Sequence, residues 1–324
     1  MNEIVNEIVN KAKNETKSET IKSPDKIHAA LEKILQEKPL TKEPLSRHTS
    51  FRVGGPAEIF VRPYTKEEFA QTWQLCRRHN IPITILGDGT NVLVADAGLP
   101  GVVISTNKMN DIALEAGQRI RAQAGARLSK VAEAACKAGL AGFEFASGIP
   151  GTVGGAVYMN AGAYDHDIGE FCECVTLLTA DGTMIKTCEE MGFGYRQSFI
   201  QGADALVLEA VFKLTPGIEA DIRTKMSDLN SRRRRSQPLD YPSAGSTFKR
   251  PAGHYAGKLI QDSNLKGFTI GGAQVSEKHA GFVINTGKAT ARDIFDIIKA
   301  IREEVHANFG VWLEPEVKIL GFEV

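Results

Sequence analysis

Two glycine-rich stretches are the residues of this chain best suited to hold a large ligand. Residues 148–164 read GIPGTVGGAVYMNAGAY and carry five glycines, and residues 85–94 read ILGDGTNVLV. Because glycine has no side chain, the backbone N–H groups of such loops can approach a ligand and bind its phosphates. Neither loop fits the Walker A pattern or the dinucleotide pattern G-x-G-x-x-G. Tight turns are the simpler alternative, but two such loops beside apolar, strand-like runs favour one extended phosphorylated ligand between them.

Two polar segments carry side chains that could take part in a reaction. Ser246 lies in SAGSTFK, an aperiodic stretch between two prolines, and loops of this kind often carry function. A serine that attacks a carbonyl would need the G-x-S-x-G elbow, which this sequence lacks, so Ser246 is expected to donate a proton unless it is a plain turn residue. Arg196 lies in GYRQS, and its planar guanidinium suits a carboxylate or a developing enolate, although surface arginines are commoner.

The C-terminal segment at 311–320 is expected to form the last strand, because apolar and polar residues alternate along it. The apolar face would hold Val311, Leu313, Val317 and Ile319, and the polar face Trp312, Glu314, Glu316 and Lys318. Periodicity cannot choose between the two glutamates, which point the same way. The two glutamates could simply lie on a solvent-exposed face of the strand, or one of them could be a catalytic carboxylate.

Composition argues against several classes of function. The chain has 324 residues with 39 basic and 39 acidic side chains, and this zero net charge argues against bulk nucleic-acid binding and a polybasic membrane anchor. No apolar run is long enough for a signal peptide or a membrane span. The five cysteines are odd in number and lack C-x-x-C spacing, and the seven histidines lack the spacing of a metal site. We therefore expect a cytoplasmic protein with reduced thiols and no metal.

Helices and strands are expected to alternate from about Pro44 onward. Residues 1–43 would form a mobile tail (1–25) and a short helix (26–37). The turn-forming pair Pro216-Gly217 would separate a domain at 44–215 from a C-terminal domain at 218–324. Apolar periodicity predicts helices over 67–80, 128–137, 218–236, 258–264 and 291–309. It predicts strands over 83–86, 102–105, 119–124, 205–214, 270–275, 282–285 and 311–320, and a hairpin over 174–187 turned by Asp181-Gly182.

Five motifs occur in an order that resembles the UDP-N-acetylenolpyruvoylglucosamine reductase (MurB) family. They are GDGTN, GIPGTVGGAVYMNAGAY, YRQS, PSAGSTFKRP and LEPEVKI, and the resemblance covers about residues 44–322. The stretch GHYAGKLIQDSNL is similar to the shorter, type II branch. The resemblance implies an α/β (α+β) architecture: a vanillyl-alcohol-oxidase/PCMH-type FAD-binding fold of two α/β subdomains at 44–215, followed by a C-terminal α/β substrate domain at 218–324.

The resemblance also implies the ligands. FAD would be bound non-covalently, NADPH would be the hydride donor, and Tyr195, Lys249 and Lys258 would contact the UDP-sugar substrate or the nicotinamide phosphate. No metal and no nucleic acid is implied, and the protein would be a cytoplasmic monomer. The residues expected to line the flavin are Gly87, Asp88, Gly89, Thr90, Asn91, Gly148, Ile149, Pro150, Gly151, Gly154, Gly155, Asn160, Ala161 and Gly162.

The activity implied by the resemblance is reduction of UDP-N-acetylglucosamine enolpyruvate to UDP-N-acetylmuramate, a step of peptidoglycan precursor synthesis. Hydride from NADPH would reach the vinyl carbon by way of the flavin. Arg196 would stabilise the enolate that develops, and Ser246 would protonate the neighbouring carbon. Glu316 would lie at the enolate, either protonated or holding a water, because a bare carboxylate would repel the charge. The alternative is an FAD-dependent oxidase of the same superfamily that acts on another substrate.

Overall fold

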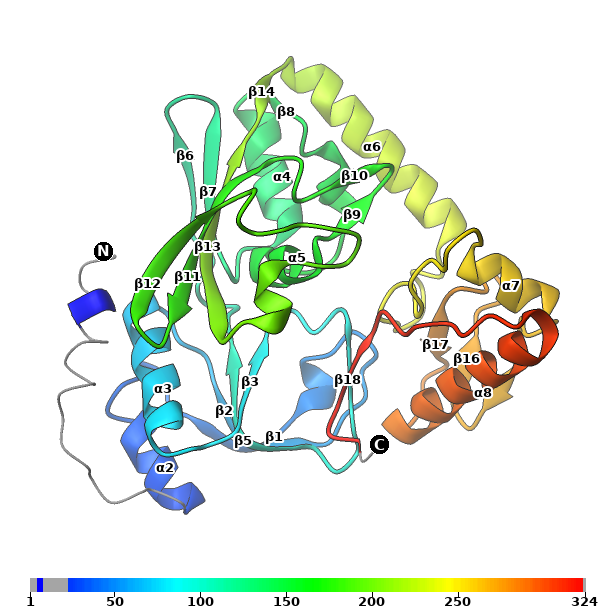
Figure 1. Ribbon diagram of the computed structural model, residues 1–324, viewed down its shortest axis with the longest axis horizontal. Helices are drawn as coiled ribbons and strands as arrows, with labels where there is room; N and C mark the ends of the chain where they lie inside the picture. The colour runs from blue at the N-terminus through cyan, green and yellow to red at the C-terminus, as the bar shows by residue number, and fades with distance from the viewer. Residues whose placement is uncertain (1–4, 8–22, 323–324) are drawn as a thin grey trace. The chain divides into compact units, whose positions relative to one another are not determined.

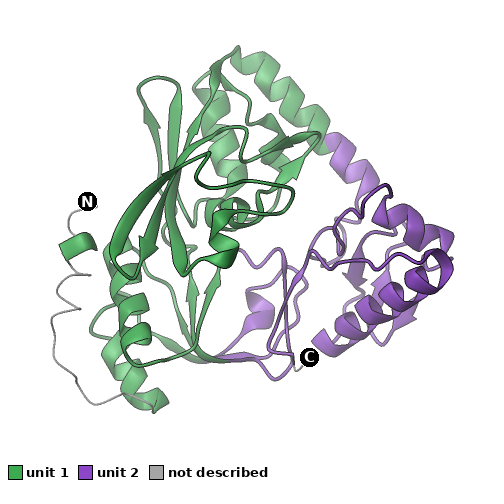
Figure 2. Ribbon diagram, in the orientation of Figure 1, with its two compact units in different colours: residues 1–41, 58–87, 100–230 green, residues 42–57, 88–99, 231–324 purple. Residues whose placement is uncertain are grey.

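The computed structural model describes residues 5–7 and 23–322 (Figure 1). The chain forms two compact units, each assembled from segments that are separate in the sequence (Figure 2). Unit 1 contains residues 1–41, 58–87 and 100–230, and unit 2 contains residues 42–57, 88–99 and 231–324. The last passage from unit 1 to unit 2 lies within helix α6 (Glu219–Ser236), whereas turn-forming residues predicted a boundary at 216–217.

The first layer of unit 1 is a sheet with strand order β1-β2-β5-β3, on which helix α3 packs. Thr65 caps α3 by accepting a hydrogen bond from the Glu68 N–H, and the helix buries Phe69, Trp73 and Cys76 against the strands. Helix α2 ends at Leu31 rather than at residue 37. The elements are α2 (Pro24–Leu31), β1 (Leu40–Pro44), β2 (Pro56–Val61), α3 (Lys66–Arg78), β3 (Ile83–Leu86) and β5 (Leu99–Ser105). The short helix η1 (Leu45–Arg47), which follows β1, belongs to unit 2.

The second layer of unit 1 is an antiparallel sheet with strand order β12-β11-β13-β7-β6. The predicted hairpin is present, but Thr179 pairs with Gly182, so its turn is Ala180-Asp181, one residue earlier than predicted. The elements are β6 (Ile112–Glu115), β7 (Arg119–Gln123), α4 (Leu128–Lys137), β8 (Leu140–Ala141), η2 (Glu144–Gly148), α5 (Val153–Met159), β9 (Gly162–Ala163), β10 (His166–Asp167), β11 (Cys172–Thr179), β12 (Gly182–Thr187), η3 (Phe199–Gly202), β13 (Ala205–Lys213) and β14 (Thr215–Pro216).

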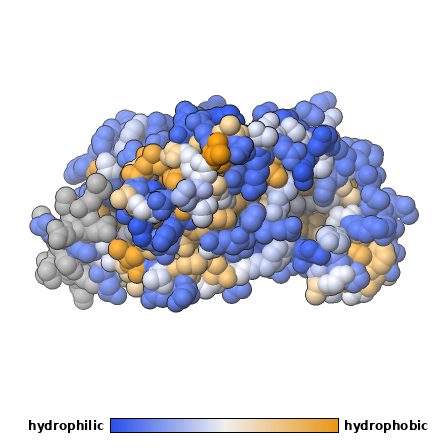
Figure 3. Space-filling view, turned by 90° about the horizontal axis from the view of Figure 1, so that it is seen from above, coloured by the Kyte–Doolittle hydropathy of each residue, from blue (hydrophilic) through white to orange (hydrophobic). Residues whose placement is uncertain are grey.

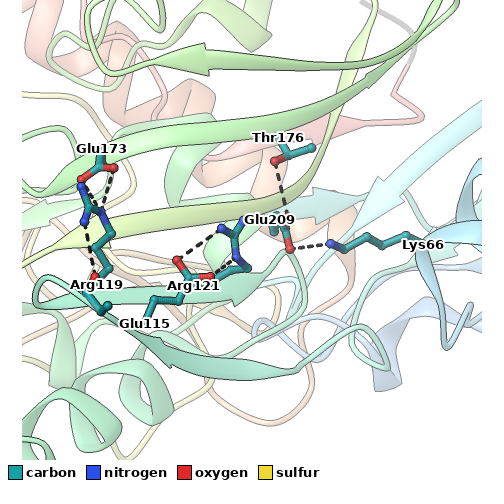
Figure 4. A network of polar contacts seen from close by, with 8 residues as sticks. Lys66, Glu115, Arg119, Arg121, Glu173, Thr176 and Glu209 are labelled. Atoms are coloured by element: carbon teal, nitrogen blue, oxygen red, sulfur yellow. Dashed lines mark hydrogen bonds and ion pairs between the residues drawn. The ribbon is translucent and has the colours of Figure 1, made fainter. Parts of the chain in front are cut away.

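A buried charge network joins the two layers of unit 1 (Figure 4). The Lys66 ammonium, at the start of α3, lies 2.5 Å from one Glu209 carboxylate oxygen on β13. Arg121 donates to the other oxygen at 3.0 Å, and the Thr176 hydroxyl lies 3.5 Å from it. Arg121 also pairs with Glu115 at 2.6 Å. The network therefore fixes the N-terminus of α3 to the larger sheet.

Unit 2 is a small sheet, ordered β15-β16-β17, covered by α8 and α7. Helix α8 has the predicted bounds because Thr290 and Asp293 form a capping box and Gly310 ends it in a left-handed conformation. The predicted strand 270–275 is wrong in one respect: Gly271-Gly272 divides it into two short strands. The elements are β4 (Val92–Val94), α7 (Ala256–Asp262), β15 (Thr269–Ile270), β16 (Ala273–Val275), β17 (Val283–Asn285), α8 (Ala291–Phe309) and β18 (Lys318–Leu320).

The predicted strand 311–320 is largely wrong. Only Lys318–Leu320 forms a strand, in parallel pairing with Val92–Val94 of β4. Before it, Pro315 has no N–H to give to a ladder, and it makes a single bridge with Phe248. The predicted alternation of buried and exposed side chains is partly present, since Leu313 and Val317 are buried while Trp312 and Glu314 are exposed.

The N-terminal residues 5–7 are helical and belong to unit 1, within the segment predicted to be a mobile tail. Val5 is fully buried in the core of the first layer, and the Asn6 side-chain carbonyl accepts a hydrogen bond from the Thr183 N–H at 2.6 Å. The rest of the predicted tail up to residue 22 lies outside the described residues.

Figure 3 shows a mostly hydrophilic face on which hydrophobic side chains gather in small groups. Across residues 5–7 and 23–322, no helix has the length and apolarity that crossing a bilayer requires.

Candidate active site

The first glycine loop runs from Gly87, at the end of β3, to Asn91, before β4. Gly89 has φ of +61°, and a Cβ there would lie 2.0 Å from the His48 carbonyl oxygen, so this position requires glycine. The Gly89 carbonyl accepts a hydrogen bond from the Ser50 N–H at 3.0 Å. The Ser50 hydroxyl is buried and has no hydrogen-bond partner among the described residues.

The second glycine loop is pinned to the end of strand β7. The N–H groups of Val153 and Gly154 donate to the carbonyls of Ala126 and Ala124, both at 2.8 Å. Gly155 differs from its neighbours because a Cβ there would meet no atom closer than 3.8 Å. Packing within the protein therefore does not demand glycine at 155, and a side chain at this position would instead fill open space beside the loop.

Within unit 1 the two loops meet at Gly87 and Thr152. A Cβ on Gly87 would lie 2.4 Å from the Thr152 hydroxyl oxygen. Thr152 is 2% exposed, and no described residue provides a partner for its hydroxyl. A buried hydroxyl without a partner is costly, so Thr152 fits a ligand that accepts its hydrogen bond. In unit 2, the Ser50 hydroxyl beside Gly89 shows the same feature.

Arg196 occupies a tight turn close to the end of the second loop. Gly194 and Gln197 bridge across Tyr195-Arg196, and Arg196 has φ of +56°, which is uncommon for a residue with a side chain. Its Nη1 and Nη2 donate to the carbonyls of Asn160 and Gly162 at 3.3 and 3.4 Å. The loop itself therefore holds the guanidinium.

Asn160 is the residue that ties this turn to the loop. Its Nδ2 donates to the Gly194 carbonyl at 3.0 Å, and its Oδ1 accepts from the Gly169 N–H at 2.9 Å. The side chain is 2% exposed and its backbone is left-handed, with φ of +42°. The amide thus binds one backbone group of the Arg196 turn, at Gly194, and one outside it, at Gly169.

In unit 2, the segments that carry Ser246 and Glu316 run side by side. The Glu316 N–H donates to the Thr247 carbonyl at 2.9 Å, and the Lys249 N–H donates to the Glu314 carbonyl at 2.9 Å. Thr247 is buried, and its hydroxyl accepts from the Val283 N–H at 3.0 Å. An exposed hydroxyl, that of Ser246, therefore stands next to a fixed carboxylate-bearing segment.

The structure separates the two glutamates that periodicity left equivalent. The Glu314 side chain is 68% exposed and pairs with the Lys249 ammonium at 2.5 Å. Glu316 is half-buried, and its carbonyl accepts a hydrogen bond from the Asn91 amide at 3.1 Å. Lys318 follows on β18, and burial, together with the charge of Lys249, lowers its pKa. Glu316 is thus the glutamate that contacts the first glycine loop.

The predicted residues fall into two groups, one in each unit. In unit 1 the structure brings together Gly87, the second loop and the turn at Tyr195-Arg196. In unit 2 it brings together Asn91, Ser246–Lys249 and Glu316, whereas Lys258 lies on α7 and pairs with Asp262 of the same helix. Sequence analysis missed Ser50 and Thr152: Thr152 lies within the second glycine loop, where its hydroxyl was a signal, whereas Ser50 is distant in the sequence and only the fold brings it to Gly89. Within the described parts of the chain, no group of three or more candidate ligands could hold a metal ion.

Comparison with known proteins covers both units. A family model for the UDP-N-acetylenolpyruvoylglucosamine reductase C-terminal domain matches residues 237–320, and a model for an FAD binding domain matches residues 57–188. The UDP-N-acetylenolpyruvoylglucosamine reductase of Clostridium perfringens (strain SM101 / Type A) is 52% identical over 279 residues, which are 86% of this chain and 91% of the relative. That of Caldanaerobacter subterraneus subsp. tengcongensis is 49% identical over 293 residues, or 90% and 97% of the two chains.

A solved structure is also similar. The crystal structure of UDP-N-acetylenolpyruvylglucosamine reductase (MurB) from Thermus caldophilus matches with a TM-score of 0.75 and 33% identity, over 87% of this chain and 98% of that one. Together with the FAD-binding match, it confirms the predicted fold class, an α/β FAD-binding fold followed by a C-terminal α/β domain.

Proposed function

Because this chain belongs to the UDP-N-acetylenolpyruvoylglucosamine reductase family, and is thus an FAD-binding oxidoreductase of peptidoglycan synthesis, we propose that it reduces UDP-N-acetylglucosamine enolpyruvate to UDP-N-acetylmuramate with NADPH. The observation that carries the proposal is the pairing of the Ser246-Thr247 segment with Glu316 in unit 2. This pairing supports the proposal because the backbone segments that carry Ser246 and Glu316 run side by side, inside the stretch that the reductase C-terminal model matches. We further propose that the protein acts in the cytoplasm as a monomer.

FAD would be held by the two glycine loops. Gly87–Asn91 and Gly148–Gly155 would line the cofactor, and the buried hydroxyls of Ser50 and Thr152, which have no partner among the described residues, would supply hydrogen-bond donors. When bound, this cofactor supplies reversible hydride transfer. Non-covalent binding fits the sequence, since neither loop contains a cysteine or histidine before His166.

Arg196 would stabilise the negative charge that develops on the substrate. Its two terminal nitrogens are already held by the carbonyls of Asn160 and Gly162, so the guanidinium would need little reorganisation when the substrate arrives. Because a guanidinium stays protonated, it would meet the substrate carboxylate as a permanent cation.

Ser246 would give its proton to the carbon beside the newly reduced one. A hydroxyl is a weak acid, but a carbanion-like carbon is basic enough to accept its proton. Glu316 would lie at the same carbon and oxygen atoms, protonated or bound to a water, so that it donates a hydrogen bond instead of repelling the developing charge. Tyr195, Lys249 and Lys258 would contact the sugar nucleotide or the nicotinamide phosphate.

An anaerobic visible spectrum of the purified protein tests the proposal. NADPH should bleach the yellow flavin, and subsequent UDP-N-acetylglucosamine enolpyruvate should restore its colour. Colour that returns only with oxygen would contradict the proposal and would point to the oxidase alternative. A protein that stays colourless after incubation with FAD would overturn the assignment of the loops.

Single-turnover rates of a serine variant test the assigned proton donor. In Ser246→Ala, flavin reduction by NADPH should stay near that of the wild type, and reoxidation by the enolpyruvyl substrate should slow by roughly 10²–10⁴-fold. Ser243→Ala, in the same loop, is the matched control and should leave both rates unchanged. Equal slowing of both half-reactions in Ser246→Ala would show that Ser246 is not the proton donor.

A further inference from the structure

One side chain of the first glycine loop is bound to the segment that carries Glu316. Asn91 donates from Nδ2 to the Glu316 carbonyl at 3.1 Å, and its own carbonyl accepts from the Lys318 N–H at 2.9 Å. Lys318 pairs with Val92 at the start of the parallel ladder between β4 and β18. The amide of Asn91 therefore extends this attachment past the end of the ladder, to residue 316.

Glu316 is thereby held on both sides of its Cα. Its N–H donates to the Thr247 carbonyl at 2.9 Å, and its carbonyl accepts from Asn91. Thr247 is a firm support, since it is 1% exposed, its N–H donates to Gly281 and its hydroxyl accepts from Val283. With both peptide groups fixed, the direction in which the Glu316 side chain leaves the backbone is fixed as well.

The loop that carries Asn91 is itself anchored in unit 2. The Asp96 carboxylate, a few residues further on, accepts hydrogen bonds from the N–H groups of Ala291 and Arg292 at the start of α8, both at 2.9 Å. Charge at a helix N-terminus makes these bonds favourable. Loss of the Asn91 amide would therefore not release the loop, and its effect should stay at Glu316.

We infer that Asn91 is a positioning residue, whose side-chain amide orients Glu316 for the protonation step and does not serve mainly to bind the cofactor. This inference rests on the proposed function. It differs from the sequence interpretation, in which Asn91 belongs with Gly87–Thr90 as part of the cofactor loop. A catalytic group displaced by about 1 Å can lose roughly 10²-fold in rate, so the amide should matter for the oxidative half-reaction.

Two variants of Asn91 test the inference on the full-length protein. Asn91→Ala removes the amide, and Asn91→Asp keeps its shape but replaces the donor with an acceptor facing the Glu316 carbonyl. In both, flavin reoxidation by the enolpyruvyl substrate should slow by about 10- to 100-fold. Flavin reduction by NADPH should stay within about 3-fold of the wild type, as should the dissociation constant of FAD from the apoprotein, measured by fluorescence quenching.

Asn285→Ala is the matched control. Asn285 is another buried amide of unit 2, whose Nδ2 donates to Phe51 and whose Oδ1 accepts from Gly287 and Ala289. Its loss should lower the melting temperature without selectively slowing reoxidation. In the apoprotein, amide hydrogen exchange of the peptide 312–320 should rise in Asn91→Ala and stay unchanged in Asn285→Ala.

Two results would overturn the inference. FAD affinity that falls more than about 10-fold, with normal half-reactions once FAD is saturating, would make Asn91 a cofactor ligand. Reoxidation as fast as in the wild type would show that the amide does not orient Glu316. Failure of the proposed function looks different, because the wild-type flavin would then not be reoxidised by the enolpyruvyl substrate at all.

Discussion

The buried pair of Lys66 and Glu209 should be the most stability-critical ion pair of unit 1 (Figure 4). Both side chains are nearly inaccessible, with 5% and 6% of their surface exposed, and their charged atoms lie 2.5 Å apart. Removing one partner of such a pair leaves an uncompensated charge in a medium of low dielectric constant, which costs about 3–5 kcal/mol. Surface pairs contribute about 0–1 kcal/mol by comparison.

The two single substitutions should not cost the same. In Glu209→Gln the Lys66 ammonium loses its carboxylate, so we expect a loss of about 3–5 kcal/mol in the free energy of unfolding. In Lys66→Met the carboxylate keeps Arg121 at 3.0 Å and the Thr176 hydroxyl at 3.5 Å, so we expect about 1–3 kcal/mol. The double variant should be more stable than Glu209→Gln alone, because it no longer buries an unpaired ammonium.

Urea unfolding of the FAD-saturated protein, followed by circular dichroism, measures these differences from the shift in midpoint. Lys137→Met is the control, since that ammonium is 68% exposed and lies 3.7 Å from Glu133 on the same helix. It should change stability by less than about 0.5 kcal/mol. A Glu209→Gln variant that loses less than about 1 kcal/mol, or a double variant whose loss equals the sum of the two singles, would refute the reasoning.

Three further predictions concern other parts of the chain. Arg196→Lys keeps the charge but loses the planar fork that binds two carbonyls, so stopped-flow reoxidation by the enolpyruvyl substrate should slow by roughly 10²-fold, and a fully active variant would exclude direct contact with the enolate. Gly55→Ala would place a Cβ 2.1 Å from the Asp96 carbonyl oxygen and should cost about 1–3 kcal/mol in urea unfolding, whereas Gly202→Ala, with no atom within 4 Å, should be neutral. Burial lowers the pKa of His279, whose Nδ1 accepts a backbone N–H, so the folded state binds fewer protons than the unfolded state below the ordinary histidine pKa of about 6.5. Stability should therefore be full above that pH and fall as the pH drops below it, and an equally steep acid loss in His279→Asn would contradict this.

Local patterns predicted the regular elements well wherever neighbouring residues decide them. The bounds of α4, α8 and β3 agree with the structure. Both helices end at a glycine with positive φ, which is a local stop signal: Gly139 follows α4, and Gly310 follows α8. The predictions failed where a distant partner decides: residues 311–317 alternate like a strand, but only 318–320 find a strand to pair with. For the same reason, periodicity could not distinguish Glu314 from Glu316. The structure distinguishes them, because Glu316 accepts a hydrogen bond from Asn91 and donates one to Thr247.

By itself, the sequence determined the fold class, the glycine loops and the family, because these depend on local composition and on motifs in a fixed order. Only the tertiary structure showed that residues 42–57 and 88–99 belong to the same compact unit as 231–324. The contacts responsible join residues about two hundred positions apart, such as Asp96 with the N-terminus of α8 and Asn91 with Glu316. Such pairings leave no periodic trace in the chain, since each is made by one polar side chain and a backbone group that any residue could supply.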